Sequence, residues 1–234
     1  MMNLSLIIPV CNDERNIYDL YMDIKDAFHE RLERYEIIFV NDGSKDGSDR
    51  VLREIVQIDP CVRRISLDRT YGKSAAIQAG ILHSSYPLIA LMDASMQTHP
   101  KDIFKLMPFI RRKDFVNGRW RTCDDKFLNK VSMDLGSRIR CWITGHKNID
   151  SICPLQLFKR EVADRLFFFN GIDRFLPVMA RMHGFSVIEV TVERNRARSS
   201  TQRRFFHNIC AGVMDAIVVA LLKTRVIRYK TKSG

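Results

Sequence analysis

The sequence predicts an α/β fold, with a mostly parallel central sheet flanked by helices, in a single domain. Through the first half of the chain, short apolar runs of strand length alternate with amphipathic stretches of helical length. No internal repeat or Pro/Gly/Ser-rich linker interrupts the 234 residues, whose hydrophobic fraction of 46% suffices for one core. We expect a domain over residues 1–204, followed by an apolar and basic helical segment over 205–234.

The expected strands are bounded by changes from apolar runs to turn residues. They are Leu4–Pro9, Glu36–Val40, Val62–Leu67, Leu88–Met92 and Phe185–Val192. Pro100 suits the first turn of a helix, and Asp125–Ile143 has helical character. The final stretch, Phe205–Arg228, is apolar with basic residues at its end, a pattern compatible with an amphipathic helix along an interface.

A net charge of +11 favours an anionic partner. Basic residues crowd the approach to the apolar C-terminal stretch, at Arg194, Arg196, Arg198, Arg203 and Arg204. This placement favours an anionic membrane surface over a nucleic acid, for which the chain shows no base-stacking motif. We therefore expect membrane association and no nucleic-acid partner.

The N-terminus and the cysteines indicate the compartment. Met1–Val10 lacks the basic start and cleavage site of a signal peptide, and Ile209–Leu222 is interrupted by Asp215, short of the roughly 18 uncharged residues of a membrane span. The six cysteines show neither C-x-x-C spacing nor a disulfide framework. We expect a cytoplasmic protein that is peripheral on the cytoplasmic face of the membrane.

Polar residues follow three of the predicted strands. Ligands of open parallel sheets bind beyond the carboxyl ends of the strands, where Asn12, Asp42 and Asp93 project. After Asp42, glycines form a turn where backbone can approach a ligand and the carboxylate can accept hydrogen bonds from a base or ribose. The alternative is a plain tight turn with Ser48 as a helix N-cap.

Asp93 ends an apolar strand and is either a ligand-facing group or a solvated strand terminus. Ser95 and Gln97 add oxygen atoms close by in the sequence. A hard cation such as Mg²⁺ or Mn²⁺ prefers oxygen ligands and shares them with a diphosphate. The neighbours therefore favour the ligand-facing alternative.

Five ordered blocks resemble the family 2 glycosyltransferases over residues 4 to about 204. The blocks are Pro9-Val10-Cys11-Asn12-Asp13-Glu14, Asn41-Asp42-Gly43-Ser44-x-x-Gly47-Ser48, Gly72-Lys73-x-Ala75-Ala76-Ile77-x-Ala79-Gly80, Asp93-Ala94-x-x-Gln97-x-x-Pro100 and Arg174-Phe175-Leu176-Pro177. The chain is similar to the branch around dolichyl-phosphate mannose synthase and the bacterial polyprenyl-phosphate glycosyltransferases. That resemblance implies a GT-A fold and transfer of a sugar from a nucleoside diphosphate to a lipid phosphate.

The resemblance also implies site residues. The residues that it implies for nucleotide binding are Pro9, Asn12, Asp13, Glu14, Asp42 and Lys73. Asp93 takes a catalytic position, and Asp93 with Gln97 takes the metal and diphosphate positions for Mg²⁺ or Mn²⁺. Ser95 replaces the second Asp of the usual Asp-x-Asp motif, which implies a weaker metal site or metal-free catalysis in which basic side chains neutralise the leaving diphosphate.

Acceptor binding is implied for basic residues in the second half. The candidates for acceptor or diphosphate phosphate are Arg119, Arg121, Lys130, Arg138 and Arg196, with a solvated basic face as the alternative. A phosphate monoester is largely ionised at neutral pH and needs no protein base. Asp150 matches a family carboxylate that would be the general base for a sugar hydroxyl, and a buried structural role is equally open.

Several positions depart from the family pattern. Thr70 stands where Asn is usual, Gln156 where Arg is common, and Glu193–Gln202 lacks the usual glycine and lysine of the diphosphate-covering loop. We expect an inverting glycosyltransferase acting on polyprenyl phosphate. The alternatives are a saccharide acceptor in cell-surface polysaccharide synthesis, or a catalytically weakened nucleotide-sugar-binding protein. Related chains often continue into transmembrane helices, so a missing transmembrane part, a membrane-protein partner or a homo-oligomer also fits.

Overall fold

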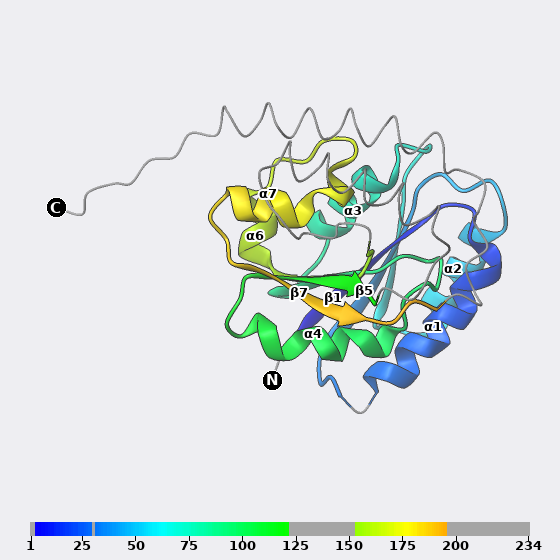
Figure 1. Cartoon of the computed structure of the whole chain (residues 1–234). Helices are drawn as coiled ribbons and strands as arrows, with labels where there is room; N and C mark the ends of the chain where they lie inside the picture. Colours follow the sequence, from blue (N-terminus) through cyan, green and yellow to red (C-terminus); the bar gives the residue numbers. More distant parts are fainter. Residues whose placement is uncertain (1–2, 30, 122–152, 196–234) are drawn as a thin grey trace, which may run out of the picture. The chain divides into compact units, whose positions relative to one another are not determined.

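The computed structural model of the protein describes residues 3–29, 31–121 and 153–195, which belong to one compact unit. These residues form a seven-stranded sheet in the order β3-β2-β1-β4-β6-β5-β7 (Figure 1). The strands are β1 (Leu4–Val10), β2 (Tyr35–Asn41), β3 (Val62–Ser66), β4 (Leu88–Leu91), β5 (Phe115–Trp120), β6 (Gln156–Lys159) and β7 (Val187–Val192). All pairings are parallel except those of β6, which is antiparallel to both β4 and β5.

Helices cover both faces of this sheet, as a mostly parallel sheet requires (Figure 1). The helical elements are α1 (Glu14–Phe28), α2 (Ser48–Ile58), α3 (Lys73–Leu82), η1 (Pro100–Asp102), α4 (Ile103–Ile110), α6 (Arg160–Arg165), η2 (Ile172–Arg174) and α7 (Leu176–Met182). Helices α1, α2 and α4 lie on one face, and α3, α6 and α7 lie on the other (Figure 1). Pro100 is at the first position of η1, which runs into α4, as predicted.

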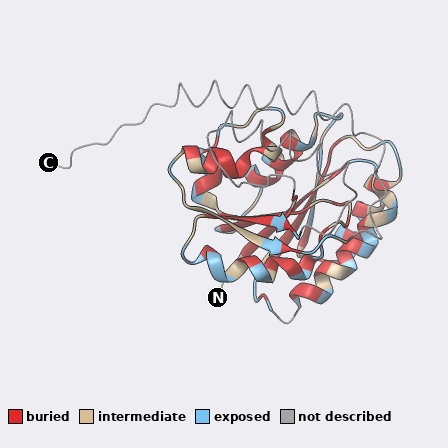
Figure 2. Ribbon diagram, viewed as in Figure 1, coloured by how far each residue is buried: buried red, intermediate tan, exposed pale blue. Residues whose placement is uncertain are grey.

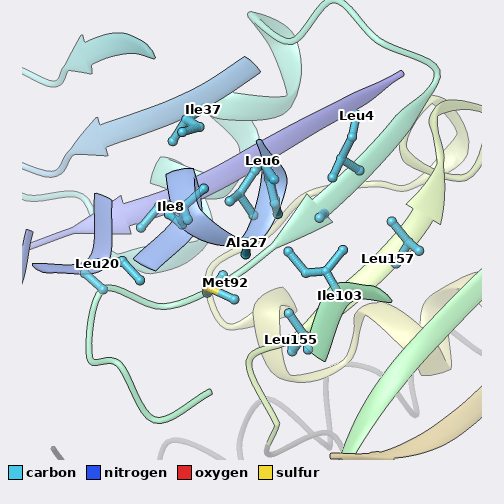
Figure 3. Close-up of a cluster of buried hydrophobic side chains, with 14 of the residues drawn as sticks. Leu4, Leu6, Ile8, Leu20, Ala27, Ile37, Met92, Ile103, Leu155 and Leu157 are labelled. Atoms are coloured by element: carbon cyan, nitrogen blue, oxygen red, sulfur yellow. The ribbon is translucent and has the colours of Figure 1, made fainter. Parts of the chain in front are cut away.

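The main hydrophobic core lies between the sheet and helices α1, α2 and α4. Alternate residues of β1, among them Leu4, Leu6 and Ile8, face Leu20 of α1 and Ile103 of α4 (Figure 3). The residues between them, such as Ile7, are also fully buried, because α3 covers the opposite face (Figure 2). Burial on both faces explains why the first strand reads as a continuous apolar run.

The α/β prediction and the expected strands are confirmed, with boundaries shifted by one or two residues. Strands β5 and β6 were not predicted as strands. Asn117 and Gly118 interrupt the apolar pattern of β5, so the sequence did not indicate a strand there. The structure explains the glycine, because a Cβ at position 118 would lie 2.8 Å from the Cys153 Sγ and from the Leu155 carbonyl oxygen. Gly118 is therefore needed for close approach of the segment leading into β6.

Other predictions fall on residues outside the described ranges. The expected helix at Asp125–Ile143 and the segment over residues 205–234 belong to this group, so the domain boundary at residue 204 stays a prediction. Among the described residues, no helix is long and apolar enough to cross a bilayer.

Candidate active site

The sheet order brings three predicted site residues to one edge. Asn12, Asp42 and Asp93 follow β1, β2 and β4, which are adjacent and parallel, so all three lie beyond the carboxyl ends of these strands. Strand β5 runs in the same direction as β4, because each is antiparallel to β6. Arg119 and Arg121, at the carboxyl end of β5, therefore lie at this edge as well. Ligands of open α/β sheets bind at this edge.

Two of the predicted nucleotide residues link neighbouring loops. The Asn12 side-chain oxygen accepts a hydrogen bond from the Lys45 amide at 2.8 Å, while the Asn12 amide donates to the Ser44 hydroxyl. The Glu14 carboxylate accepts from the Gly47 amide at 3.0 Å. Asn12 and Glu14 therefore fix the loop after β1 against the loop after β2.

The carboxylate of Asp42 is directed at backbone. Its two oxygens accept hydrogen bonds from the amides of Tyr71 and Gly72, at 2.7 and 2.9 Å, and the residue is only 3% exposed. The Thr70 hydroxyl donates to the Asp42 carbonyl at 3.1 Å. Gly43, at a φ of +60°, lies so close to the Arg69 backbone that a Cβ would clash. The sequence suggested direct contact with a base or ribose, whereas this geometry positions the loop at 69–72.

That loop carries an exposed aromatic face. The Tyr71 side chain is 44% exposed, and the Arg69 guanidinium lies 4.9 Å from its ring centroid. A planar ring with a cation beside it can stack against a nucleobase. Tyr71 was not predicted as a site residue, and the only available signal was its place next to the third family-like block.

Asp13 lies close to Asp93 in an acidic part of the site. Burial raises the pKa of Asp13, and the negative charges of Asp93 and Asp46 raise it further, against the lowering effect of the hydrogen bond from the Cys11 amide. Two neighbouring carboxylates repel one another and favour a cation between or beside them. The protein itself supplies one such cation at Lys73.

Lys73 begins α3, and its ammonium lies 2.5 Å from the Asp93 carboxylate. Burial alone would lower the pKa of Lys73, but the charges of Asp93 and Asp173 outweigh it and raise the pKa above its usual value. The side chain as a whole is nevertheless 39% exposed. Lys73 is thus a protonated ammonium group held beside the Asp93 carboxylate at the strand edge.

Asp93 and the residues after it offer one carboxylate and two further side-chain oxygen atoms to a hard cation. The Ser95 hydroxyl is buried and has no hydrogen-bond partner among the described residues, and the Gln97 side-chain oxygen accepts from Arg194 at 3.3 Å. Within the described ranges, no cluster of three His, Cys, Asp or Glu side chains has metal-binding geometry. Asp93, Gln97 and Ser95 offer oxygen atoms only, the ligand type that Mg²⁺ and Mn²⁺ accept.

A second, basic pocket of about 510 Å³ lies at the ends of β5 and β7. Its lining residues are Lys105, Arg119, Trp120, Arg121, Thr191 and Glu193. Arg121 is 71% exposed and 4.0 Å from Glu193, and Arg119 is 51% exposed and 3.9 Å from Glu189. These long, exposed pairs leave both guanidinium groups accessible to an anion.

The basic pocket and the Asp93 loop share contacts. Arg194 lies over the Trp120 ring at 5.5 Å and also donates to Gln97. The Asn195 amide donates to the Gln97 carbonyl at 2.8 Å. The start of the predicted diphosphate-covering loop therefore lies against the Asp93 loop. The other predicted site residues, Lys130, Arg138, Asp150 and Arg196, lie outside the described ranges.

Comparison with known families decides the classification of this site. Residues 5–167, more than half of the chain, match glycosyl transferase family 2. The chain belongs to this family. The match contains four of the five sequence blocks and confirms the resemblance inferred from them.

Curated relatives of this family-2 chain transfer sugars to polyprenyl phosphates, according to their names. The undecaprenyl-phosphate 4-deoxy-4-formamido-L-arabinose transferase of Proteus mirabilis is 29% identical over 191 residues. The alignment covers 81% of this chain but 59% of that relative, so the chain spans well under the relative's full length. The dodecaprenyl-phosphate galacturonate synthase of Rhizobium johnstonii is 27% identical, over 100% of this chain and 70% of its own length.

Solved structures confirm the fold. Glucosyl-3-phosphoglycerate synthase from Mycobacterium tuberculosis, in complex with Mn²⁺, UDP and phosphoglyceric acid, superimposes with a TM-score of 0.72 at 16% identity. The superposition covers 97% of this chain and 80% of that one. The complex of the same enzyme with Mn²⁺ and UDP-glucose gives a TM-score of 0.67. The predicted GT-A fold is therefore confirmed.

Proposed function

We propose that this chain is an inverting glycosyltransferase that moves a sugar from a nucleoside diphosphate to a polyprenyl phosphate. The observation that carries the proposal is the pairing of two sites at one sheet edge. Lys73 and Asp93 form a charged site suited to a diphosphate, and Arg119 and Arg121 line a basic pocket beyond it. Family membership and the names of the curated relatives support the same chemistry.

In this proposal the donor lies across the ends of β1, β2 and β4. The nucleoside packs against Pro9, Asp13 and the loop that Asp42 holds, with its base beside Tyr71. The diphosphate lies beside Lys73, whose positive charge stabilises the negative charge that develops as the sugar–oxygen bond breaks. A divalent cation, Mg²⁺ or Mn²⁺, would be held by Asp93 and Gln97 and would neutralise further diphosphate charge.

The acceptor phosphate lies between the guanidinium groups of Arg119 and Arg121. Its second pKa is about 6, so at neutral pH it carries an ionised oxygen and attacks the anomeric carbon without a protein base. A new phosphate–sugar bond forms as the bond to the nucleoside diphosphate breaks, with inversion at the anomeric carbon. The protein contributes orientation of the two anions and stabilisation of the leaving group.

The lipid acceptor also suggests where the chain works. We propose peripheral association with the cytoplasmic face of a membrane, where the polyprenyl phosphate head group is within reach of the basic pocket. A transmembrane partner or a further copy of the chain remains compatible with this arrangement. The net charge of +11 supports attraction to an anionic surface.

Radiolabelled nucleotide sugars and undecaprenyl or dolichyl phosphate test the proposal, each with Mg²⁺, with Mn²⁺ and with EDTA. We expect a labelled lipid product from one donor, loss of at least about 100-fold in kcat for Asp93→Ala, and a comparable loss for Lys73→Met. The exposed residue Gln78 of α3 provides a control, since Gln78→Ala should transfer at the wild-type rate. Transfer to a saccharide alone, or donor binding without turnover, would contradict the proposal.

A further inference from the structure

A narrow crevice opens beside the Lys73–Asp93 pair, between the start of α3 and the start of β6. It has a volume of about 10 Å³, enough for one water-sized group, and its walls are of mixed polar and apolar character. Four polar side chains reach it, namely Lys73, Asp93, Gln156 and Asp173. Gln156 and Asp173 were not predicted as site residues, although Gln156 was noted as a departure from the family pattern.

Three of the four polar groups already have partners. Lys73 and Asp93 pair with each other, and the Asp173 carboxylate accepts from the Ser74 hydroxyl at 2.8 Å. The side-chain oxygen of Gln156 differs. It is buried, in a residue only 2% exposed, and it has no hydrogen-bond partner among the described residues. An unsatisfied buried acceptor destabilises a fold unless a ligand or water completes it.

The sheet holds Gln156 in place from both sides. It is the first residue of β6 and is paired in register with Leu91 of β4 and Asn117 of β5. Asn117 in turn donates to Glu189 of β7 at 3.5 Å. Cross-strand partners share a face of the sheet, so Gln156 belongs to a row of polar groups that leads from the crevice toward Arg119.

We propose that Gln156 determines the specificity for the donor sugar. Its amide oxygen accepts a hydrogen bond from one hydroxyl of the transferred sugar, which enters the crevice beside Asp93. The crevice has room for one hydroxyl group. The unpaired Gln156 oxygen is a hydrogen-bond acceptor, so it favours an O–H or N–H group of the sugar and disfavours a carboxylate at this position. This inference rests on the proposed function, because it requires a nucleotide-sugar donor at the Lys73–Asp93 site.

A site that hydrogen-bonds a substrate hydroxyl rejects the analogue that lacks it far more strongly than an apolar site does. Wild-type protein should therefore bind its parent nucleotide sugar at least about 100-fold more tightly than one of the four monodeoxy analogues of that sugar. Gln156→Met has a similar shape but no acceptor oxygen, and it should reduce this ratio to below about fivefold. Gln156→Glu keeps an acceptor oxygen but places a third carboxyl group beside Asp93 and Asp173, so it should retain the discrimination while weakening binding of the anionic diphosphate.

Isothermal titration calorimetry with the free nucleoside diphosphate, the parent nucleotide sugar and the deoxy analogues tests this, and thermal unfolding of each variant accompanies it. For Gln156→Met we expect unchanged affinity for the free diphosphate and an unfolding midpoint that equals or exceeds the wild-type value, because an orphaned acceptor is removed. Persistent discrimination in Gln156→Met, an equal loss of affinity for the free diphosphate, or a lower midpoint would overturn the inference alone. Failure of the wild type to bind any of UDP, GDP, CDP and dTDP would overturn the proposed function as well.

Discussion

At the scale of single residues, several polar groups of the site bind backbone, and this makes their effect on a ligand indirect. The Asp42 carboxylate accepts hydrogen bonds from two backbone amides of the loop at 69–72. The side chains of Asn12 and Glu14 connect the loop after β1 to the loop after β2. The places of Asn12 and Asp42 after predicted strands correctly indicated that both lie at one edge of the sheet, and the family resemblance added Glu14. Neither observation could show which atoms these residues contact, because a carboxylate after a strand serves a ligand and a loop amide equally well.

Asp42→Asn tests the positioning role of this carboxylate. The amide nitrogen of Asn cannot accept a hydrogen bond, so one of the two loop amides, at Tyr71 or Gly72, loses its partner. We expect a loss of about 1–3 kcal/mol in the free energy of unfolding by urea. Hydrogen exchange should accelerate at the amides of Tyr71 and Gly72 while β1 stays protected. Unchanged exchange at both amides would contradict the positioning role.

At the scale of elements, one carboxylate links the start of β5 to the end of β6 and the start of β7. Asp114, just before β5, accepts from the Lys159 ammonium of β6 at 2.8 Å. It also accepts from the amide and hydroxyl of Ser186, before β7, at 2.9 and 2.7 Å. Burial alone would raise the pKa of Asp114, but the bonds from Lys159 and Ser186 outweigh it and lower the pKa to about 2.

This link predicts an acid-sensitive contribution to stability. The folded pKa of Asp114 is below its unfolded value of 3.8, so its contribution is full above about pH 5 and is lost as the pH falls toward 2. Because the carboxylate is 29% exposed, we expect about 1 kcal/mol. Asp114→Asn should lower the free energy of urea unfolding at pH 7 but not at pH 2. Asp164→Asn, on the exposed side of α6, is the control, and an equal loss at both pH values would rule the link out.

The elements also show where sequence reasoning succeeds. β1 and β4 were predictable because burial on both faces makes them continuous apolar runs. β6 was not, since it has only four residues and begins with the polar Gln156, and Asn117 breaks the pattern of β5. Gln156 lines the proposed sugar crevice, and Asn117 is its cross-strand partner in β5. Local pattern therefore fails where the sheet serves a site rather than the core.

At the scale of the whole molecule, charge favours one kind of partner. The net charge of +11 includes five arginines between residues 194 and 204, next to the apolar C-terminal stretch. A basic cluster beside an apolar segment binds anionic lipid with about 1 kcal/mol for each basic residue near the surface. Exposed charges are screened over about 10 Å at 0.1 M salt, so such binding must weaken as salt is added.

Replacing Arg198, Arg203 and Arg204 together by Gln tests this charge-driven association. Sedimentation with phosphatidylglycerol-containing vesicles should show binding up to about 100-fold weaker than wild type at 0.1 M salt. The control replaces Arg15, Arg50 and Arg53, on α1 and α2, by Gln and so removes the same positive charge. It should bind these vesicles nearly as well as the wild type. Both proteins should bind neutral phosphatidylcholine vesicles poorly. Equal weakening by the two variants would mean that net charge alone, and not the cluster, holds the chain at the membrane.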